Sequence, residues 1–230
     1  SEGVREFNLI AQDSSFYGRD LNDGTTLARL LKELVKIDNV KWIRLFYLYP
    51  TYFDDELLEI ITKEEKICKY VDIPLQHISD SVLGRMHRRD YSQSIKKLLK
   101  KLRNTTPYIT IRTTLMVGFP GETEADFKEL LTFIKAVKFD NMGAFTYSAQ
   151  DGTPAARMVD QVTEEIKENR YHELMAAQAE ISEENNRNLI GVDTEVLVEE
   201  LLDDGCGNLQ AKGRASFQAP EVDGNVYIDH

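Results

Sequence analysis

The chain has 230 residues, of which 42% are hydrophobic and 29% charged, enough for one large globular domain or a medium domain followed by a small one. Its net charge of −11 opposes binding to a phosphate backbone and favours a basic partner. The apolar runs are too short to cross a membrane, no signal sequence opens the chain, and only Cys68 and Cys206 are present, so a cytoplasmic location is expected.

Alternating strand and helix patterns cover the first two thirds of the chain. Short apolar or β-branched runs predict strands at 5–11, 42–49, 70–75, 109–117 and 142–147. Apolar residues three and four apart predict helices at 25–37, 54–64, 79–87, 91–103 and 122–137, with Thr25, Asp54, Ser79 and Ser92 as N-caps. This order predicts an α/β fold with a parallel sheet, open or curled into a barrel.

A long polar helix at 163–188, capped by Thr163, is predicted to lead away from the sheet. After Gly191 the apolar period changes to two, which predicts a small antiparallel β-domain. We therefore expect one domain at 1–190 and a second, incomplete one at 191–230. The second carries nine acidic residues against Lys212 and Arg214, a net charge of −7.

Polar and aromatic residues follow the predicted strands where each strand ends. The carboxyl ends of parallel strands share one face, and ligands bind there. The predicted site therefore collects Gln12, Asp13, Gln76, His77, Gly118, Phe119, Tyr147 and Ser148. Taken singly, His77 at a strand end or Gln12-Asp13 in a turn would also fit a purely structural role.

Two arginines lie inside apolar strands, where an unpaired charge would cost several kcal/mol. Arg112 and Arg44 each therefore need a carboxylate partner or a bound anion. A bound ligand is the preferred partner for Arg112, and the two explanations are equally good for Arg44.

Several motifs resemble one enzyme family. TLMVGFPGETEADF, NLIAQDSSFYG and FTYSAQDGTPAA are similar to segments of the radical S-adenosylmethionine methylthiotransferases. YVDIPLQHIS and WIRLFYLYP resemble the branch that modifies an aspartate of ribosomal protein S-twelve more than the tRNA-modifying branch. Residues 194–229 resemble the first part of a TRAM domain, the small β-barrel that ends these enzymes.

This resemblance implies a radical-SAM barrel with five of its six β/α units, lacking the first strand, followed by a truncated TRAM-like β-barrel. It implies S-adenosylmethionine and two [4Fe–4S] clusters in the intact protein, whose cysteine ligands are absent from this chain; a fragment without them is expected to be inactive. In the intact enzyme, a radical would remove hydrogen from the aspartate β-carbon, which then receives a methylthio group.

The resemblance also implies roles for the strand-end residues, although no catalytic residue and no metal ligand is assigned. Gln76, His77 and Arg112 would bind the ribose and methionine carboxylate, and Gly118 and Phe119 would border the adenine. The remaining floor of the pocket would be formed by Gln12, Asp13, Tyr147 and Ser148.

The acidic C-terminal domain is expected to bind the basic ribosomal protein, with nucleic acid a less favoured partner.

Three alternative functions were weighed against this one. One is a tRNA methylthiotransferase with the same fold, and another is a non-catalytic adaptor that binds through its acidic β-domain. A barrel lyase or aldolase is disfavoured because no lysine and no cluster of His, Asp or Glu lies at the strand ends.

Overall fold

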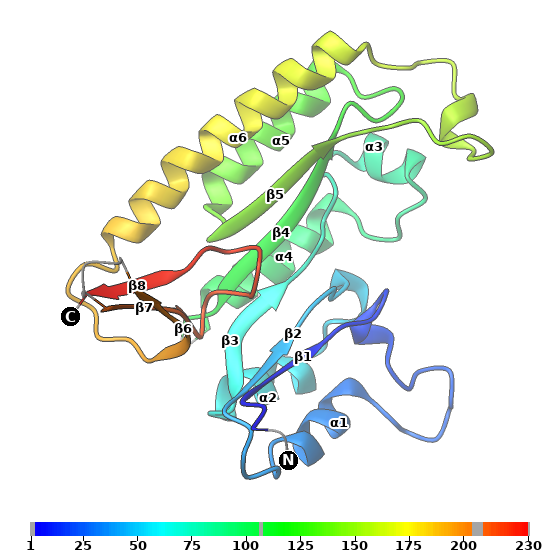
Figure 1. Ribbon diagram of the computed structural model, residues 1–230. Coiled ribbons are helices and arrows are strands. Elements are labelled where there is room, and N and C mark those ends of the chain that lie inside the picture. The colour runs from blue at the N-terminus through cyan, green and yellow to red at the C-terminus, as the bar shows by residue number, and fades with distance from the viewer. Residues whose placement is uncertain (1–2, 106–107, 204–208, 230) are drawn as a thin grey trace.

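The computed structural model describes residues 3–105, 108–203 and 209–229, so Cys206 lies outside the described part (Figure 1). These residues form a five-stranded parallel sheet with flanking helices and a separate three-stranded antiparallel sheet. Both were predicted from the sequence, and the α/β fold is confirmed. In the described part of the chain, no helix is long and apolar enough to cross a membrane.

The large sheet has the strand order β1-β2-β3-β4-β5, with every neighbouring pair parallel. Such a singly wound order is the one found in β/α barrels. Its strands are β1 (Glu6–Leu9), β2 (Trp42–Leu45), β3 (Ile67–Asp72), β4 (Thr110–Val117) and β5 (Asn141–Thr146).

Helices connect the strands and cover one face of the sheet. Figure 1 shows α1 and α2 near β1 and β2, and α5 and α6 against β4 and β5. The helices are η1 (Ser14–Phe16), α1 (Leu27–Leu34), η2 (Pro50–Tyr52), α2 (Asp55–Lys63), α3 (Asp80–Arg85), α4 (Ser92–Arg103), α5 (Glu124–Val137), η3 (Ala155–Arg157) and α6 (Glu164–Arg187).

Two of the predicted N-caps form the expected side-chain hydrogen bonds. Asp54 accepts from the backbone of α2 and Thr163 from that of α6. Two other predicted N-caps are wrong by one residue: α1 is capped by Thr26 instead of Thr25, and α4 by Tyr91 instead of Ser92. Ser79 caps α3 without a side-chain bond, because its hydroxyl donates to Asp126 instead.

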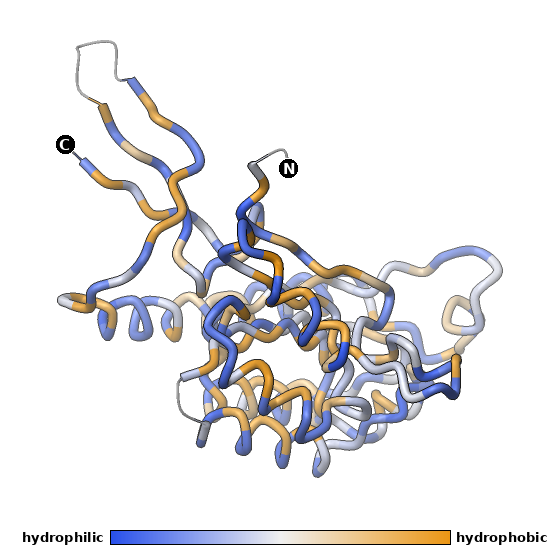
Figure 2. The backbone as a smooth tube through the Cα atoms, turned by 90° about the horizontal axis from the view of Figure 1, so that it is seen from below, coloured by the Kyte–Doolittle hydropathy of each residue, from blue (hydrophilic) through white to orange (hydrophobic). Residues whose placement is uncertain are grey.

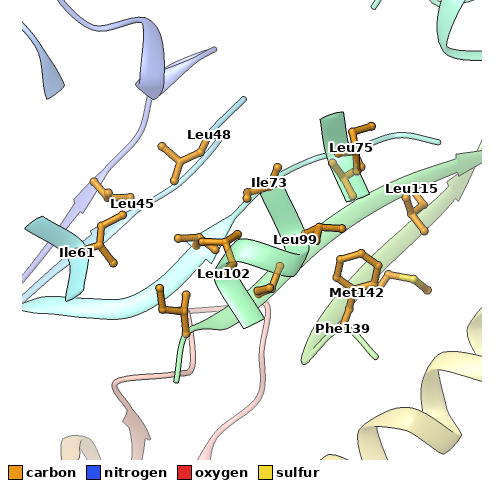
Figure 3. Close-up of a cluster of buried hydrophobic side chains, with 14 of the residues drawn as sticks. Leu45, Leu48, Ile61, Ile73, Leu75, Leu99, Leu102, Leu115, Phe139 and Met142 are labelled. Atoms are coloured by element: carbon orange, nitrogen blue, oxygen red, sulfur yellow. The ribbon is translucent and has the colours of Figure 1, made fainter. Parts of the chain in front are cut away.

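The two faces of the sheet have different chemistry, because side chains alternate along each strand. The face toward the helices is apolar. Figure 3 shows this layer, in which Leu45 and Leu115 of the sheet and Ile61, Leu99 and Leu102 of α2 and α4 are all at most 2% exposed. The opposite face, here called the inner face, carries aromatic and charged side chains, namely Trp42, Arg44, Phe46, Tyr70, Asp72 and Arg112.

The antiparallel sheet consists of β6 (Val196–Asp203), β7 (Leu209–Ala215) and β8 (Val226–Asp229), in that order. In Figure 2 it projects from the body of the protein. The segment 216–223 between β7 and β8 returns to the inner face, where Ala219 is fully buried among Trp42, Phe46 and Tyr70. The second sheet is thus anchored on the first.

Arg44 lies at this contact and is fully buried. Its Nε donates to Glu6 over 2.8 Å, and its Nη1 donates to the carbonyl of Ser216 over 2.9 Å. Glu6 also accepts from Arg214 over 2.6 Å. A carboxylate of the chain itself therefore balances the charge of Arg44, and the network joins the two sheets.

Candidate functional site

The segments that follow the five strands are joined to one another by backbone hydrogen bonds. The N–H of Ser14 donates to Tyr47, and the N–H of Leu48 donates to Asp72. Both the N–H and the carbonyl of Gln76 form backbone hydrogen bonds with β4. The N–H of Tyr147 donates to the carbonyl of Val117. The strand ends therefore form one continuous edge, as their common direction predicts.

Three of the six described non-glycine residues with positive φ lie along or beside this edge. Tyr47 and Gln76 adopt the left-handed conformation, with φ values of 53° and 67°, and His87 after α3 has a φ of 56°. Non-glycine residues adopt this conformation at a cost, and they are common at ligand-binding sites. Gln76 pairs with β4 as an isolated bridge at Leu115, after Pro74 has interrupted the ladder of β3.

Phe119 and Tyr147 form an aromatic cluster at the ends of β4 and β5. Their ring centroids are 5.1 Å apart in an edge-to-face arrangement, and both rings are less than 10% exposed. Met116 and Met86 pack against the cluster that this pair forms with Val82. The hydroxyl of Tyr147 is buried and has no hydrogen-bond partner within the described residues, which leaves an unmet hydrogen-bonding capacity at the strand ends.

The turn after β4 is held by a buried acid. Glu122 accepts a hydrogen bond from the N–H of Gly118 over 2.7 Å and one from Arg170 over 2.8 Å. Gly118 has a φ of 74°, and a Cβ there would lie 2.2 Å from Cγ of Lys167. Only glycine fits this turn without displacing Lys167.

His77 lies beneath this turn and is fully buried. Its Nδ1 accepts from the N–H of Ser79 over 3.0 Å, and its Nε2 lies 3.7 Å from Glu122. Burial lowers the pKa of His77 to about 4, so the imidazole is neutral near pH 7 and makes no ion pair with Glu122. His77 supports the turn from within the protein and has no exposed surface from which to contact a ligand.

Gln12 and Asp13 line a cavity of about 600 Å³ at the ends of β1 and β2. Asp13 accepts a hydrogen bond from Ser15 over 2.5 Å. Met86 lines the same cavity and also packs against the cluster of Val82, Phe119 and Tyr147, so it links the two parts of the edge. Ser148 is exposed beyond β5, where it accepts a hydrogen bond from Gln150.

Arg112 is separate from these residues. It lies near the beginning of β4, and its Nη1 donates to Asp223 of the C-terminal segment over 2.7 Å. A carboxylate of the chain itself therefore satisfies the charge, and the structure does not bring Arg112 to the edge where the other candidates meet. We leave Arg112 out of the site that we propose below.

Asp72 is a feature of the inner face that the sequence analysis did not single out. It is 3% exposed, and burial raises the pKa of its carboxyl. Its Oδ2 accepts from the N–H of the strained Tyr47 over 3.1 Å, which connects β3 to the exit of β2. In the sequence, Asp72 could have been recognised as an acid within the apolar run YVDIPL, just as Arg112 was recognised as a charge within an apolar strand.

These residues fit an adenosyl ligand better than a metal. The edge offers an apolar wall at Phe119 and Tyr147, an unpartnered hydroxyl, and the amide of the half-buried Gln76. Within the described residues, no group of three or more His, Cys, Asp or Glu could hold a metal ion. Cys68 is buried behind the inner face, and burial raises the pKa of its thiol to about 11.

Comparison with known families decides the class of this fold. Residues 3–134, more than half of the chain, match the Radical SAM superfamily. The chain belongs to that superfamily. Residues 190–230, which include the antiparallel sheet, match the TRAM domain.

Curated relatives are similar along almost the whole chain. The ribosomal protein uS12 methylthiotransferase RimO of Pelobacter propionicus is 52% identical over 228 residues, which cover 99% of this chain. RimO of Citrifermentans bemidjiense is 53% identical over 226 residues. The chain spans about half the length of these relatives, 50% in both cases.

Solved structures confirm the fold. Coproporphyrinogen III oxidase (HemN) of Escherichia coli, a radical SAM enzyme, matches with a TM-score of 0.61 and 17% identity over 77% of this chain and 41% of its own. The radical S-adenosylmethionine methyltransferase TsrM of Kitasatospora setae matches with a TM-score of 0.54 and 16% identity, over 67% of this chain and 30% of its own. At such identities the likeness concerns the fold alone.

Proposed function

We propose that the protein to which this chain belongs is a radical S-adenosylmethionine methylthiotransferase that modifies an aspartate of ribosomal protein uS12. The observation that carries this proposal is the identity of about 50% to RimO proteins over 99% of the chain. The motifs at the strand ends, which resemble the same branch of the family, support it. A location in the cytoplasm, where ribosomes are made, follows from this function.

We assign the binding of S-adenosylmethionine to the edge formed by the strand ends. S-adenosylmethionine, when bound, supplies the oxidising group that removes a hydrogen atom from the substrate. Phe119 and Tyr147 would form the apolar wall of the adenosyl site, and Gln76 would supply a directed hydrogen bond. The buried His77, Glu122 and Arg170 hold the turn at Gly118 in place, which keeps this wall rigid.

The intact protein would also need two [4Fe–4S] clusters, as the resemblance implies. The described residues contain no set of ligands for either cluster. The cysteines would therefore come from the half of the relatives' length that this chain does not span.

The acidic C-terminal domain is our proposed contact for uS12. Among the described residues, four of its acids pair with cations: Glu195 with Lys41, Glu199 with Arg214, Glu200 with Lys212, and Asp223 with Arg112. Asp223 is fully buried in its pair, whereas Glu195 and Glu200 remain more than half exposed. We expect the exposed acids to attract a basic protein, with binding that weakens as salt rises.

The reconstituted full-length protein tests this function. With S-adenosylmethionine, a reductant and uS12, it should add one methylthio group to an aspartate, detected by mass spectrometry of uS12 peptides. Unmodified tRNA is the matched alternative substrate in the same reaction. Methylthiolation of tRNA with none on uS12 would contradict the proposal and favour the tRNA-modifying branch.

A further inference from the structure

Besides Gln12 and Asp13, the cavity at the ends of β1 and β2 contains groups to which the proposed adenosyl site assigns no role. Three segments form its wall: residues 11–16 after β1, residues 49–52 after β2, and residues 86–89 after α3. Its volume of about 600 Å³ exceeds what a single amino-acid side chain would occupy. Its lining includes Asp13, Phe16, Tyr49, Tyr52, Arg88 and Arg89.

Arg88 is the fixed cation of this cavity. Its Nη2 donates to the carbonyl of Pro74 over 2.9 Å and lies 3.7 Å from Asp90, while its guanidinium stacks 4.7 Å above the ring of Tyr49. Its side chain is 11% exposed. These contacts hold the 86–89 segment, including its strained His87, against the strand ends.

Arg89 is the free cation. It is exposed, its Nη1 makes one contact, a long hydrogen bond of 3.5 Å to the hydroxyl of Tyr52, and no described carboxylate lies within 4 Å of it. By contrast, its sequence neighbour Arg88 already has an acid partner. In a chain with 39 acidic and 28 basic residues, an arginine without an acid, placed on the wall of a cavity, is available to an external anion.

The remaining walls suit a peptide. The edge-to-face pair Phe16–Tyr52, with centroids 5.3 Å apart, and Tyr49 provide apolar surface that strengthens a charge interaction. Asp13 lies on the same wall, where its carboxylate can accept a hydrogen bond from a peptide N–H, a donor that a nucleic-acid backbone lacks. A single carboxylate on a peptide therefore fits this lining better than a nucleic-acid backbone, which the net charge of −11 also opposes.

We propose that this cavity binds the acidic side chain of the peptide substrate, with Arg89 pairing with its carboxylate and the tyrosines packing on the flanking residues. This inference rests on the proposed function, because it takes the target to be an aspartate within a peptide segment. It makes Arg89 a specificity-determining residue that distinguishes aspartate from asparagine. Met86 lines this cavity and packs against the cluster of Val82, Phe119 and Tyr147, so the bound aspartate would lie on the side of the cavity that leads toward the proposed adenosyl site.

The test is the affinity of the full-length protein for a fluorescent uS12 peptide containing the target aspartate, measured by anisotropy. Arg89→Gln should weaken binding about 10-fold or more, since a charge-assisted hydrogen bond is lost. A peptide with asparagine at the target should bind the wild type and Arg89→Gln equally, and Arg89→Lys should retain part of the affinity. Arg29→Gln, an exposed arginine of α1 outside the cavity, should have no effect.

Equal affinity of the wild type and Arg89→Gln for the aspartate peptide would overturn the inference. So would an equal loss of both peptides, or Arg89-dependent binding of a labelled RNA in place of the peptide. Methylthiolation assays distinguish failure of the inference about Arg89 from failure of the proposed function. If the wild-type holoenzyme modifies uS12 and Arg89→Gln does so with an unchanged KM, only the inference fails; if the wild type modifies no uS12, the proposed function fails.

Discussion

Removing Asp223 should detach the C-terminal sheet from the inner face of the barrel. Its side chain is fully buried and accepts three hydrogen bonds. The donors are Arg112 Nη1 at 2.7 Å, the Tyr70 hydroxyl at 2.6 Å and the N–H of Ala219 at 2.9 Å. Asp223→Ala would leave Arg112 with only Asp72, whose carboxylate is 3.7 Å away.

The expected cost follows from this burial. Breaking a buried ion pair by removing one partner costs about 3–5 kcal/mol, because the other charge stays buried without compensation. The Arg112 side chain is 16% exposed, so water relieves part of this penalty and about 3 kcal/mol is the better expectation. Glu200→Gln is the matched control: it breaks a pair with Lys212 in the same sheet, but Glu200 is 54% exposed, and such pairs contribute about 0–1 kcal/mol.

Urea unfolding followed by tryptophan fluorescence measures the difference. Trp42 is the single tryptophan of the 230-residue chain, and it packs in the cluster that contains Ala219, so its emission reports on the anchored segment. The unfolding midpoint should fall clearly for Asp223→Ala and stay nearly constant for Glu200→Gln. Equal midpoints for the two variants would show that the buried contact does not anchor the domain and would refute the reasoning.

Three further predictions concern the buried residues of the site. Gly118→Ala should lower the free energy of unfolding by about 1–3 kcal/mol, because the new Cβ would meet Lys167, and Lys167→Ala in the same chain should restore part of it in a urea titration. Burial lowers the pKa of His77 from 6.5 to about 4, so stability should fall as pH drops from about 6.5 to about 4; His77→Asn should show a smaller fall in urea midpoints measured across that range. Cys68, with its pKa raised to about 11, should resist iodoacetamide at pH 8 until urea unfolds the protein, as peptide mass spectrometry would show; rapid labelling of the native protein would contradict its burial.

The order of strands and helices could be predicted because hydrophobic period is a local property. The third strand shows the limit of this reasoning. It was expected at 70–75 and is found at Ile67–Asp72, because Pro74 cannot donate to the ladder and the apolar residues beyond Asp72 lie outside the regular strand. The cap of α1 is a similar case, since Thr25 and Thr26 are equally good caps in the sequence and the helix begins after the second.

The candidate site was predictable only where strand direction decides position. The exits of all five strands meet along one edge, as their parallel order requires. The partner of Arg112 was not predictable, because Asp223 is 111 residues away and belongs to another sheet. Arg88 and Arg89 were missed because they follow a helix, and the topological rule points only to residues that follow strands.

The sheet therefore has two roles, to anchor the C-terminal segment and to lead to the proposed ligand site. The alternation of side chains along a strand does not distinguish between them. Arg44 on β2 and Arg112 near the start of β4 bind the C-terminal segment through Ser216 and Asp223. Farther along the same strand, β4 leads to Phe119 and the proposed adenosyl wall. Position along β4 therefore decides the role: the charge of Arg112 near the amino end of the strand anchors a domain, whereas Phe119 beyond its carboxyl end lines the proposed adenosyl wall.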